Sequence, residues 1–433
     1  MSRLFGLTAL ALLMALMFYI SRFGSGGFPL SMLLGFLLLA GFVLGKLGNM
    51  IELPGITGYL AAGIVMGPSL LGVMDRQAVA DLELINSFAL TLIALTAGGE
   101  VDLRRIARSF KSFLLIVSGQ MTITFVSVFL LMAWVLSFFP AEFPFGAAGL
   151  VAVGALFAVT SIANSPSSTV AVIVESGARG RMTELTLGIT IIKDIVVIVA
   201  FALTFGFVSQ MFDSAATAVV HGHSLAAELS WEIGGSIGFG ITLGLLIIGY
   251  MKYIGTEIPV FVIALSYLVT VGSRAMTLHP LLVCMTAGLA VNNMSGRGHS
   301  FIEAIEKGSL PLYVIFFAIA GAGIDFTVLA DVWVLVLVLT ISRLTFTWLG
   351  TWLGARVAGE QSSVRDNIWM GFLAQAGITL GIAVIVAENF PGWGDTFKSV
   401  VIGSIALFQV SGPVLFKFGL GRAGELPARK NTT

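Results

Sequence analysis

The chain has 433 residues, of which 57% are hydrophobic and 11% charged, and its 23 basic and 23 acidic residues give a formal net charge of zero. Because a soluble domain carries about 25% charged residues, this composition excludes a water-soluble globular protein. The mean hydropathy of +1.00 indicates an all-α polytopic membrane protein instead. Without a net charge there is no reason to expect a nucleic-acid partner, and the bilayer is the expected environment.

Apolar runs of membrane-spanning length follow one another along the chain with short connectors. We count fourteen, at about 5–22, 29–48, 54–73, 83–99, 111–138, 146–175, 183–209, 233–253, 257–273, 279–293, 309–325, 329–355, 367–388 and 398–420. Most are about 17–25 residues or slightly longer, which suits tilted transmembrane helices. The alternation of a β-barrel is absent, so backbone groups must be satisfied within helices.

The first run lies within residues 1–24 and resembles a signal peptide in outline. It has little charge before the apolar stretch and no clear small-residue cleavage site after it. We therefore expect it to be retained as an extra N-terminal transmembrane helix.

The sixth run is interrupted at Thr160-Ser161-Ile162-Ala163-Asn164-Ser165-Pro166. Pro166 has no N–H group and disfavours helix at the residue before it. Hydroxyl and amide side chains offer other hydrogen bonds to the freed backbone groups. We expect a broken helix here, with Thr160, Ser161 and Asn164 lining an ion site. The alternative is a kinked helix whose small residues permit close packing.

Lys193 and Asp194 interrupt the seventh run, which otherwise has no charge in its interior. At about 1.5 Å per residue, Asp194 lies roughly 16 Å from the start of the run at Thr183, about half the thickness of the bilayer core. A charge at this depth costs about 3 kcal/mol on insertion scales and is expected only where it has a function. Asp194 is our candidate ligand for a monovalent cation. The alternative is a packing ion pair with Lys193 or Arg343.

Neighbouring residues on a helix point about 100° apart, so Lys193 and Asp194 cannot share one face. We consider three roles for Lys193: binding a backbone carbonyl at a helix break, carrying a proton, or substituting internally for a cation. Arg343 lies within the twelfth run. It could stabilise facing half-helix C-termini or restrain Asp194.

The thirteenth run contains a second polar interruption, at Gln375, Gly377 and Thr379. It occupies the place in the second half of the chain that the break at Pro166 occupies in the first. Broken helices in corresponding positions point to a binding site near the membrane midplane. The alternative is again a kink with small residues for close packing.

The ends of the fourth and eleventh runs are similar, Ala-Gly-Gly-Glu-Val-Asp at 97–102 and Ala-Gly-Ala-Gly-Ile-Asp at 320–325. The two runs are seven spans apart and therefore point in opposite directions. This is the pattern of an inverted-topology repeat, in which the second to seventh spans pair with the ninth to fourteenth.

The basic residues give the orientation. If the N-terminus is cytoplasmic, seventeen of the 23 lie on the cytoplasmic side, four lie outside, and Lys193 and Arg343 lie within spans. This asymmetry is what the positive-inside rule predicts, so we expect both termini to be cytoplasmic. The expected location is the plasma membrane, namely the inner membrane of a bacterium.

Other polar residues are weaker candidates. Cys284 lies in an apolar run and has no second cysteine to pair with. We expect interfacial rather than transport roles for a further set of polar residues: Glu100, Asp102, Asp325 and His279. The HxH pair His221 and His223 lies in an outer loop and is a poor metal site. No nucleotide-binding loop, potassium-channel filter or hydrolase motif is present, so we expect no enzyme, no cofactor and no nucleotide.

These features resemble the monovalent cation:proton antiporter superfamily, particularly its second branch of bacterial sodium/proton and potassium-efflux antiporters. The similarity covers roughly residues 29–420. The segments that show it are 54–63, Gly67-Pro68-Ser69, 97–102, 160–166, Lys193-Asp194, Phe316-Phe317 with Gly321 and Asp325, and 374–377. The resemblance implies that Asp194 is the ion-binding residue and that Arg343 is the membrane-embedded basic residue of the twelfth span.

The resemblance also implies the architecture. It predicts a sodium/proton-antiporter-like fold of two inverted six-helix repeats with crossed broken helices, assembled as a homodimer. A dimerisation scaffold would comprise 29–103 and 257–325, and an ion-transport core 111–209 and 329–420. The segment 233–253 would be a linker helix and 421–433 a cytoplasmic tail. Transport would follow elevator-like motion of the core against the scaffold.

Lys193 departs from the family, whose members have Asp, Asn or Gln at this position. It removes an acceptor and adds a positive charge, so stoichiometry and ion choice stay open. The leading interpretation is exchange of Na⁺ or K⁺ for protons. The alternatives are an antiporter-fold protein with a sensory or assembly role, and a transporter or channel for another solute.

Overall fold

The computed structural model describes residues 30–50, 53–99, 104, 109–212, 225–278, 280–295, 298–323, 326–375 and 377–427. The expected helix at 1–24 lies outside these residues. So do several polar candidates: Glu100, Asp102, His221, His223, His279 and Asp325. The described elements are all helical, as the composition predicts.

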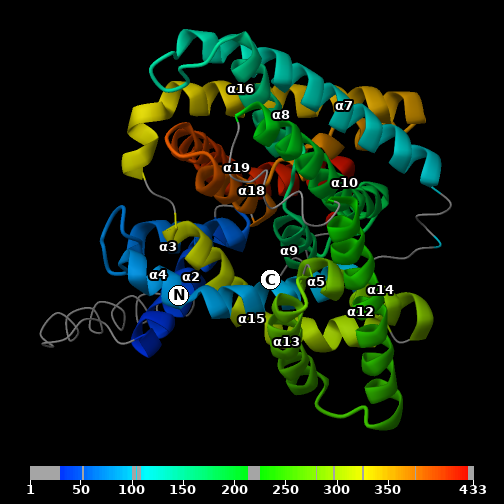
Figure 1. Ribbon diagram of the computed structural model, residues 1–433. Coiled ribbons are helices and arrows are strands. Elements are labelled where there is room, and N and C mark those ends of the chain that lie inside the picture. Colours follow the sequence, from blue (N-terminus) through cyan, green and yellow to red (C-terminus); the bar gives the residue numbers. More distant parts are fainter. Residues whose placement is uncertain are drawn as a thin grey trace, which may run out of the picture.

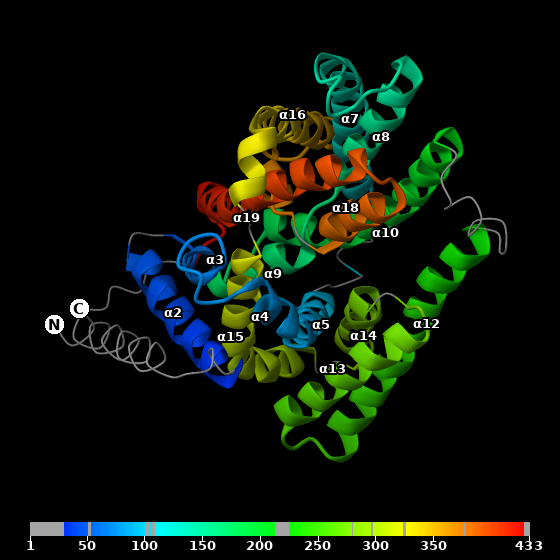
Figure 2. The same ribbon diagram turned by 60° about the vertical axis from the view of Figure 1, so that its left-hand side comes forward.

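The helices form two groups, which Figures 1 and 2 show on opposite sides of α9. The first group comprises α2 (Leu30–Met50), α3 (Gly55–Met66), α4 (Arg76–Asp81), α5 (Glu83–Gly99), α12 (Leu225–Tyr253), α13 (Ile258–Ala275), α14 (Pro280–Ser295) and α15 (Gly298–Ala322). Within it, α3 packs between α2 and α15, and α14 packs between α5 and α12.

The second group comprises α7 (Phe110–Val135), η1 (Leu136–Phe138), α8 (Ala147–Ile162), α9 (Pro166–Ser176), α10 (Arg181–Met211), α16 (Phe326–Ala358), α17 (Ser362–Arg365), η2 (Ile368–Phe372), α18 (Gly377–Asn389) and α19 (Trp393–Ala423). Here α7 packs along α16, and α19 packs against α16 and α18. α9 and α19 also contact α5 and α3, and so join the two groups. The first group contains the expected scaffold segments together with α12, the expected linker helix, and the second contains the expected core segments. The division into domains stays a prediction.

Glycines allow helix backbones to touch in the first group. A methyl group at Gly63 of α3 would overlap the carbonyl of Ala318 in α15, and one at Gly321 would overlap the carbonyl of Leu60. Likewise, a methyl group at Gly98 of α5 would overlap the backbone of Met285 in α14. Small residues at helix contacts are typical of membrane proteins, where close van der Waals packing drives association.

Within the described residues, six helices are long and apolar enough to cross a membrane, and six shorter apolar helices of 10–17 residues accompany them. The expected count of fourteen spans and the inverted repeat stay predictions. Some boundaries differ from expectation. α3 ends at Met66 because Gly67 and Pro68 follow, and α15 begins at Gly298, well before the apolar run at 309. Polar residues can extend a helix beyond the membrane, which hydropathy alone does not detect.

Candidate ion site at two facing helix breaks

The first break lies between α8 and α9. Ala163 and Ser165 are extended, with ψ of 148° and 109°, and α9 starts at Pro166. Proline is well suited to the first helical position because its missing N–H would have no partner there. Ser165 caps the new helix, since its hydroxyl accepts a hydrogen bond from Ser168 N at 3.2 Å. The sequence therefore determines this break locally, as expected.

The second break follows the 3₁₀ turn η2, which ends at Phe372, and precedes α18, which begins at Gly377. Leu373, Ala374 and Gln375 between them are buried and have no helical hydrogen-bond ladder. Buried backbone groups outside a helix need other partners. The second break obtains them from the first.

The two breaks bind each other directly. Ser165 N donates to the Ala374 carbonyl at 2.8 Å, and Gln375 Nε2 donates to the Thr160 carbonyl at 2.8 Å. Thr169 of α9 donates through Oγ1 to the Gly371 carbonyl at 3.2 Å. Segments more than 200 residues apart in sequence therefore form one hydrogen-bonded unit.

Arg343 of α16 completes this unit. Its guanidinium donates to four carbonyls, Ser161 and Ala163 of the first break and Phe372 and Leu373 of the second, at 2.7–3.0 Å. The last carbonyls of a helix have no intrahelical partner and form the negative end of its dipole, so a buried cation is favourable there. Arg343 thus takes the role of stabilising facing half-helix C-termini, and its side chain is only 1% exposed.

Asp194 and Lys193 lie on α10 beside both breaks. Asn164 Nδ2 of the first break donates to Thr190 Oγ1 at 3.0 Å, and Thr190 is one helical turn before Asp194. Lys193 Nζ lies 4.9 Å from the centroid of the Phe372 ring at the second break. Both charged side chains are buried, with Asp194 8% exposed and Lys193 0%.

The ion pairs of the described residues do not include Asp194. The packing ion pair that we considered for it, with Lys193 or Arg343, is therefore not formed in this structure. Nor does Lys193 bind a break carbonyl, because its Nζ has no hydrogen-bond partner among the described residues and Arg343 holds those carbonyls. Among the described residues, the Asp194 carboxylate therefore has no ion-pair partner.

Further oxygen atoms around the crossing are unpaired among the described residues. They include Asn164 Oδ1, Thr186 Oγ1 and Thr379 Oγ1. The hydroxyls of Thr160 and Ser161 donate back to the Phe157 carbonyl, which leaves their oxygens as acceptors. Carboxylate, amide and hydroxyl oxygens are hard ligands that suit an alkali cation.

Ten residues were expected at the site, and they fall into three sets. Hydrogen bonds join Gln375 to Thr160 and Arg343 to Ser161, and Asn164 of the first break donates to Thr190 of α10. Pro166 and Gly377 begin the second half-helices, and Thr379 is buried in the first turn of α18. Lys193 and Asp194 approach from α10. Thr190 and Phe372 were missed; a clue to Thr190 was its position four residues before Asp194, on the same helix face.

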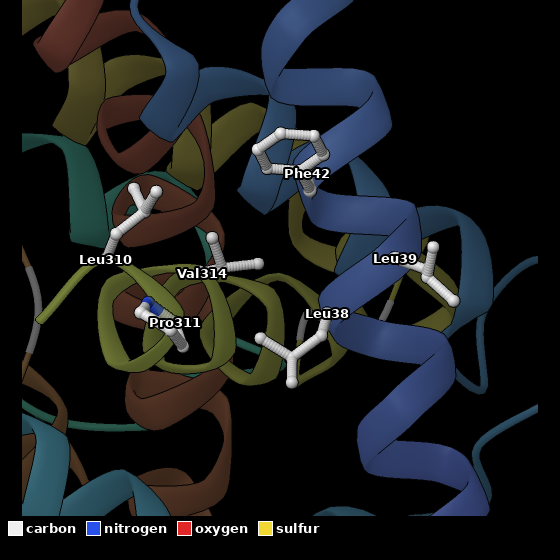
Figure 3. Close-up of a pocket in the computed structure, with 6 residues that line it drawn as sticks. All are labelled: Leu38, Leu39, Phe42, Leu310, Pro311 and Val314. Carbon is white, nitrogen blue, oxygen red and sulfur yellow. The ribbon is translucent and has the colours of Figure 1, made fainter. Parts of the chain in front are cut away.

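A separate cavity of about 250 Å³ lies between α2 and α15, as Figure 3 shows. It is lined by Leu38, Leu39, Phe42, Leu310, Pro311 and Val314. Its lining side chains are apolar and have no oxygen ligand for a cation. The crossing of the two breaks is therefore the better candidate site.

At one end of the core, charged side chains tie α10 to its neighbours. Arg181 donates to Glu360 at 2.6 Å and also to Ser109. Burial by itself raises the pKa of Glu360, but hydrogen bonds from Arg181 and Ser112, with the charge of Arg181, outweigh it and hold the pKa below its usual value. Glu425 caps α10 by accepting from Met182 N and Thr183 N at 2.6 and 2.8 Å. The helix with Asp194 is thus fixed within the core.

The sequence profile of the family described as "Sodium/hydrogen exchanger, transmembrane" matches residues 34–417. The chain belongs to the sodium/hydrogen exchanger family. The match covers both helix breaks, the Lys193-Asp194 pair and Arg343, so the suspected resemblance is confirmed at the level of the family.

Three named antiporters are similar over 88% of this chain. They are the Na⁺/H⁺ antiporter NhaS5 of Synechocystis (25% identical), the probable Na⁺/H⁺ antiporter GerT of Bacillus cereus (22%) and the Na⁺/H⁺-K⁺ antiporter GerN of Bacillus cereus (22%). The chain spans 53% of the length of NhaS5, 96% of GerT and 95% of GerN. These relatives are transporters and not enzymes.

Solved structures give the fold independently. Two structures of the sodium proton antiporter MjNhaP1 from Methanocaldococcus jannaschii align with TM-scores of 0.62 and 0.68 at 16% identity. They cover 91% and 92% of this chain and 97% and 98% of theirs. The helical fold of a sodium/hydrogen exchanger therefore extends over nearly the whole chain.

Proposed function

We propose that the chain is a secondary antiporter that exchanges a monovalent cation, Na⁺ or K⁺, for protons. The observation on which this rests is the Asp194 carboxylate, buried beside two facing helix breaks and without an ion pair among the described residues. Membership of the sodium/hydrogen exchanger family and the antiporter names of three relatives support the same function.

The coupling follows from competition at one group. An ionised Asp194 binds a cation with help from neighbouring oxygens such as those of Asn164 and Thr160, and a protonated Asp194 does not. Because Asp194 binds either a cation or a proton but not both, each cation that crosses in one direction is matched by protons that cross in the other. No cofactor takes part in such a cycle.

Arg343 supports this site without taking part in the exchange. Its charge is used by four carbonyls of the breaks, so it keeps their dipoles from competing for the transported cation. Lys193 stands closer to Asp194 in sequence and has no hydrogen bond among the described residues. A positive charge there weakens cation binding, and release of its proton would permit a second proton to move.

We further propose that exchange occurs by elevator-type alternating access in a multi-pass inner-membrane homodimer. The core with both breaks, α7–α10 and α16–α19, would slide against the scaffold of α2–α5 and α13–α15, with α12 as the linker helix. Both termini would be cytoplasmic, as the distribution of basic residues predicts. Two of the helices that contact across the groups, α9 and α19, belong to the moving part.

One observation favours a different function. A buried Lys193 beside Asp194 could make the site unable to bind a cation, which would leave an antiporter fold with a sensory or assembly role. A transport assay separates the two functions directly.

The test is proton movement in proteoliposomes that contain the purified full-length protein and a pH-sensitive dye. After a proton gradient is formed, addition of Na⁺, K⁺ or Li⁺ should dissipate it in protein-containing vesicles and not in empty ones. If none of the three cations moves protons at any pH around neutrality, the chain is not a cation:proton antiporter.

A further inference from the structure

Two charged side chains of the core hold the beginning of α3 in the scaffold. Glu175, near the end of α9, accepts hydrogen bonds from Gly55 N at 2.6 Å and Ile56 N at 3.2 Å. Lys417 of α19 donates to the Leu53 carbonyl at 3.3 Å. Three backbone groups, the Leu53 carbonyl before α3 and the Gly55 and Ile56 N–H groups in its first turn, are thus bound from the other group of helices.

The chemistry of this contact is complementary on both sides. The first N–H groups of a helix have no intrahelical partner and form the positive end of its dipole, which favours the carboxylate of Glu175. Pro54 precedes α3 and provides no side-chain cap, so Glu175 supplies the cap that the local sequence lacks. Lys417 donates to the Leu53 carbonyl just before the helix.

The contact can also be broken. Glu175 is exposed, unlike Asp194 and Arg343, so water can replace its hydrogen bonds when the helices separate. By contrast, Glu425 makes a similar cap on α10, but both of its partners lie within the core. Two caps of the same kind therefore differ in one respect, namely whether they cross between the two groups.

We propose that Glu175 and Lys417 form a latch that holds the core against α3 in this conformation and opens each time the core moves. The inference rests on the proposed exchange function and names the contact that its conformational step must break. The charge distribution places Lys417, Leu53 and the α9–α10 connection at the cytoplasmic side, so the latch controls that side of the protein.

The test is to prevent the latch from opening. Glu175→Cys and Gly55→Cys are combined in a Cys284→Ala background and joined by a short, reducible bifunctional thiol crosslinker. A methyl group at Gly55 would lie 3.3 Å from Glu175 Oε1, so a cysteine there faces the position of the carboxylate. The control is Thr183→Cys with Glu425→Cys, a pair with a similar cap geometry that does not cross between the two groups of helices.

Both pairs are assayed in proteoliposomes before crosslinking, after it, and after reduction. We expect the Gly55–Glu175 crosslink to stop exchange and reduction to restore it, while the Thr183–Glu425 crosslink leaves exchange unchanged. Exchange that continues with the Gly55–Glu175 crosslink in place overturns the latch. So does a pair that mass spectrometry shows not to crosslink, because the two residues are then not in contact.

The failure of the latch and of the exchange function are distinguishable. If the uncrosslinked protein moves no protons with any cation, the proposed function is wrong. If it does so and continues to do so when crosslinked, only the latch is wrong.

Discussion

Arg343 of α16 and the Lys193-Asp194 pair of α10 both lie at the helix crossing, and their surroundings differ sharply. Arg343 donates to four carbonyls, and its guanidinium also lies 4.4 Å from the Phe408 ring centroid. Asp194 has no ion pair among the described residues, and Lys193 Nζ lies 4.9 Å from the Phe372 ring centroid without a hydrogen-bond partner in the same part of the chain. A buried charge that makes four hydrogen bonds stabilises the structure, whereas a buried carboxylate without an ion pair is available to a cation or a proton.

The largest effect on transport is expected from a substitution of Asp194. Asp194→Asn keeps the size of the side chain and removes its charge and its ability to exchange a proton. We expect proton movement in proteoliposomes to fall to the level of empty vesicles, with the apparent melting temperature in detergent unchanged or raised, because a buried charge is removed. Residual exchange in this variant would show that Asp194 is not the coupling group.

The next largest effect, on stability, is expected from a substitution of Arg343. Arg343→Met leaves four carbonyls of the breaks without their donor, which should cost about 3 kcal/mol or more of stability. Thermal unfolding in detergent measures it. Arg343→Lys is the matched control, since it keeps the charge but cannot reach four acceptors. Its stability should lie between that of the parent and that of Arg343→Met. A Met variant as stable as the parent would contradict a structural role for Arg343.

A smaller loss of stability should follow from removing one hydrogen bond between the two breaks. Gln375→Leu removes the donor to the Thr160 carbonyl and should cost about 1–2 kcal/mol, because a buried acceptor is left unpaired. The same unfolding measurement detects it. If stability does not change, the hydrogen bond between Gln375 and Thr160 is not formed in the membrane.

Outside the crossing, the Arg181–Glu360 pair provides a reference for a partly exposed contact. Glu360→Gln should cost at most about 1 kcal/mol, because water screens the pair. The pKa of Glu360 is lower in the folded protein than in the unfolded chain. The pair therefore stabilises the folded protein fully at pH values above the pKa of the unfolded chain, and this stabilisation is lost as the pH falls through the lower pKa of the folded protein. The stability difference between parent and variant should vanish in acid, and a difference independent of pH would exclude this linkage.

The smallest change is expected for Lys193→Gln. Removing a positive charge beside Asp194 should leave cation binding intact or raise the apparent affinity for Na⁺ or K⁺ a few-fold, which the cation dependence of proton movement reports. Lys193→Met removes the same charge without adding an acceptor and serves as the control. A complete loss of cation binding in both variants would show that the amine is needed at the site.

The sequence predicted the parts of this site that depend on local chemistry. Pro166 and its polar neighbours indicated the first break, which the structure has between α8 and α9. The depth of Asp194 in the bilayer stays a prediction. The role of Arg343 was one of two that its position allowed. Its particular acceptors, Ser161, Ala163, Phe372 and Leu373, could not be predicted, because they depend on how two segments about 200 residues apart pack together.

The same limit applies to the contacts between the two groups of helices. Glu175 and Gly55 are 120 residues apart, and Lys417 and Leu53 are 364 apart. Hydropathy and periodicity describe one helix at a time and contain no information on such pairs. The extension of α15 back to Gly298 was missed for a related reason, since a helix can continue into water where the apolar pattern stops.

The glycine contacts between α3 and α15 limit where this protein can change. With backbone against backbone at Gly63 and Gly321, a single carbon atom is enough to wedge the helices apart. Drift of the sequence over generations is therefore expected on the lipid-facing sides of these helices and not along this seam. Anyone who engineers the chain for tighter binding or longer shelf life should leave that seam untouched.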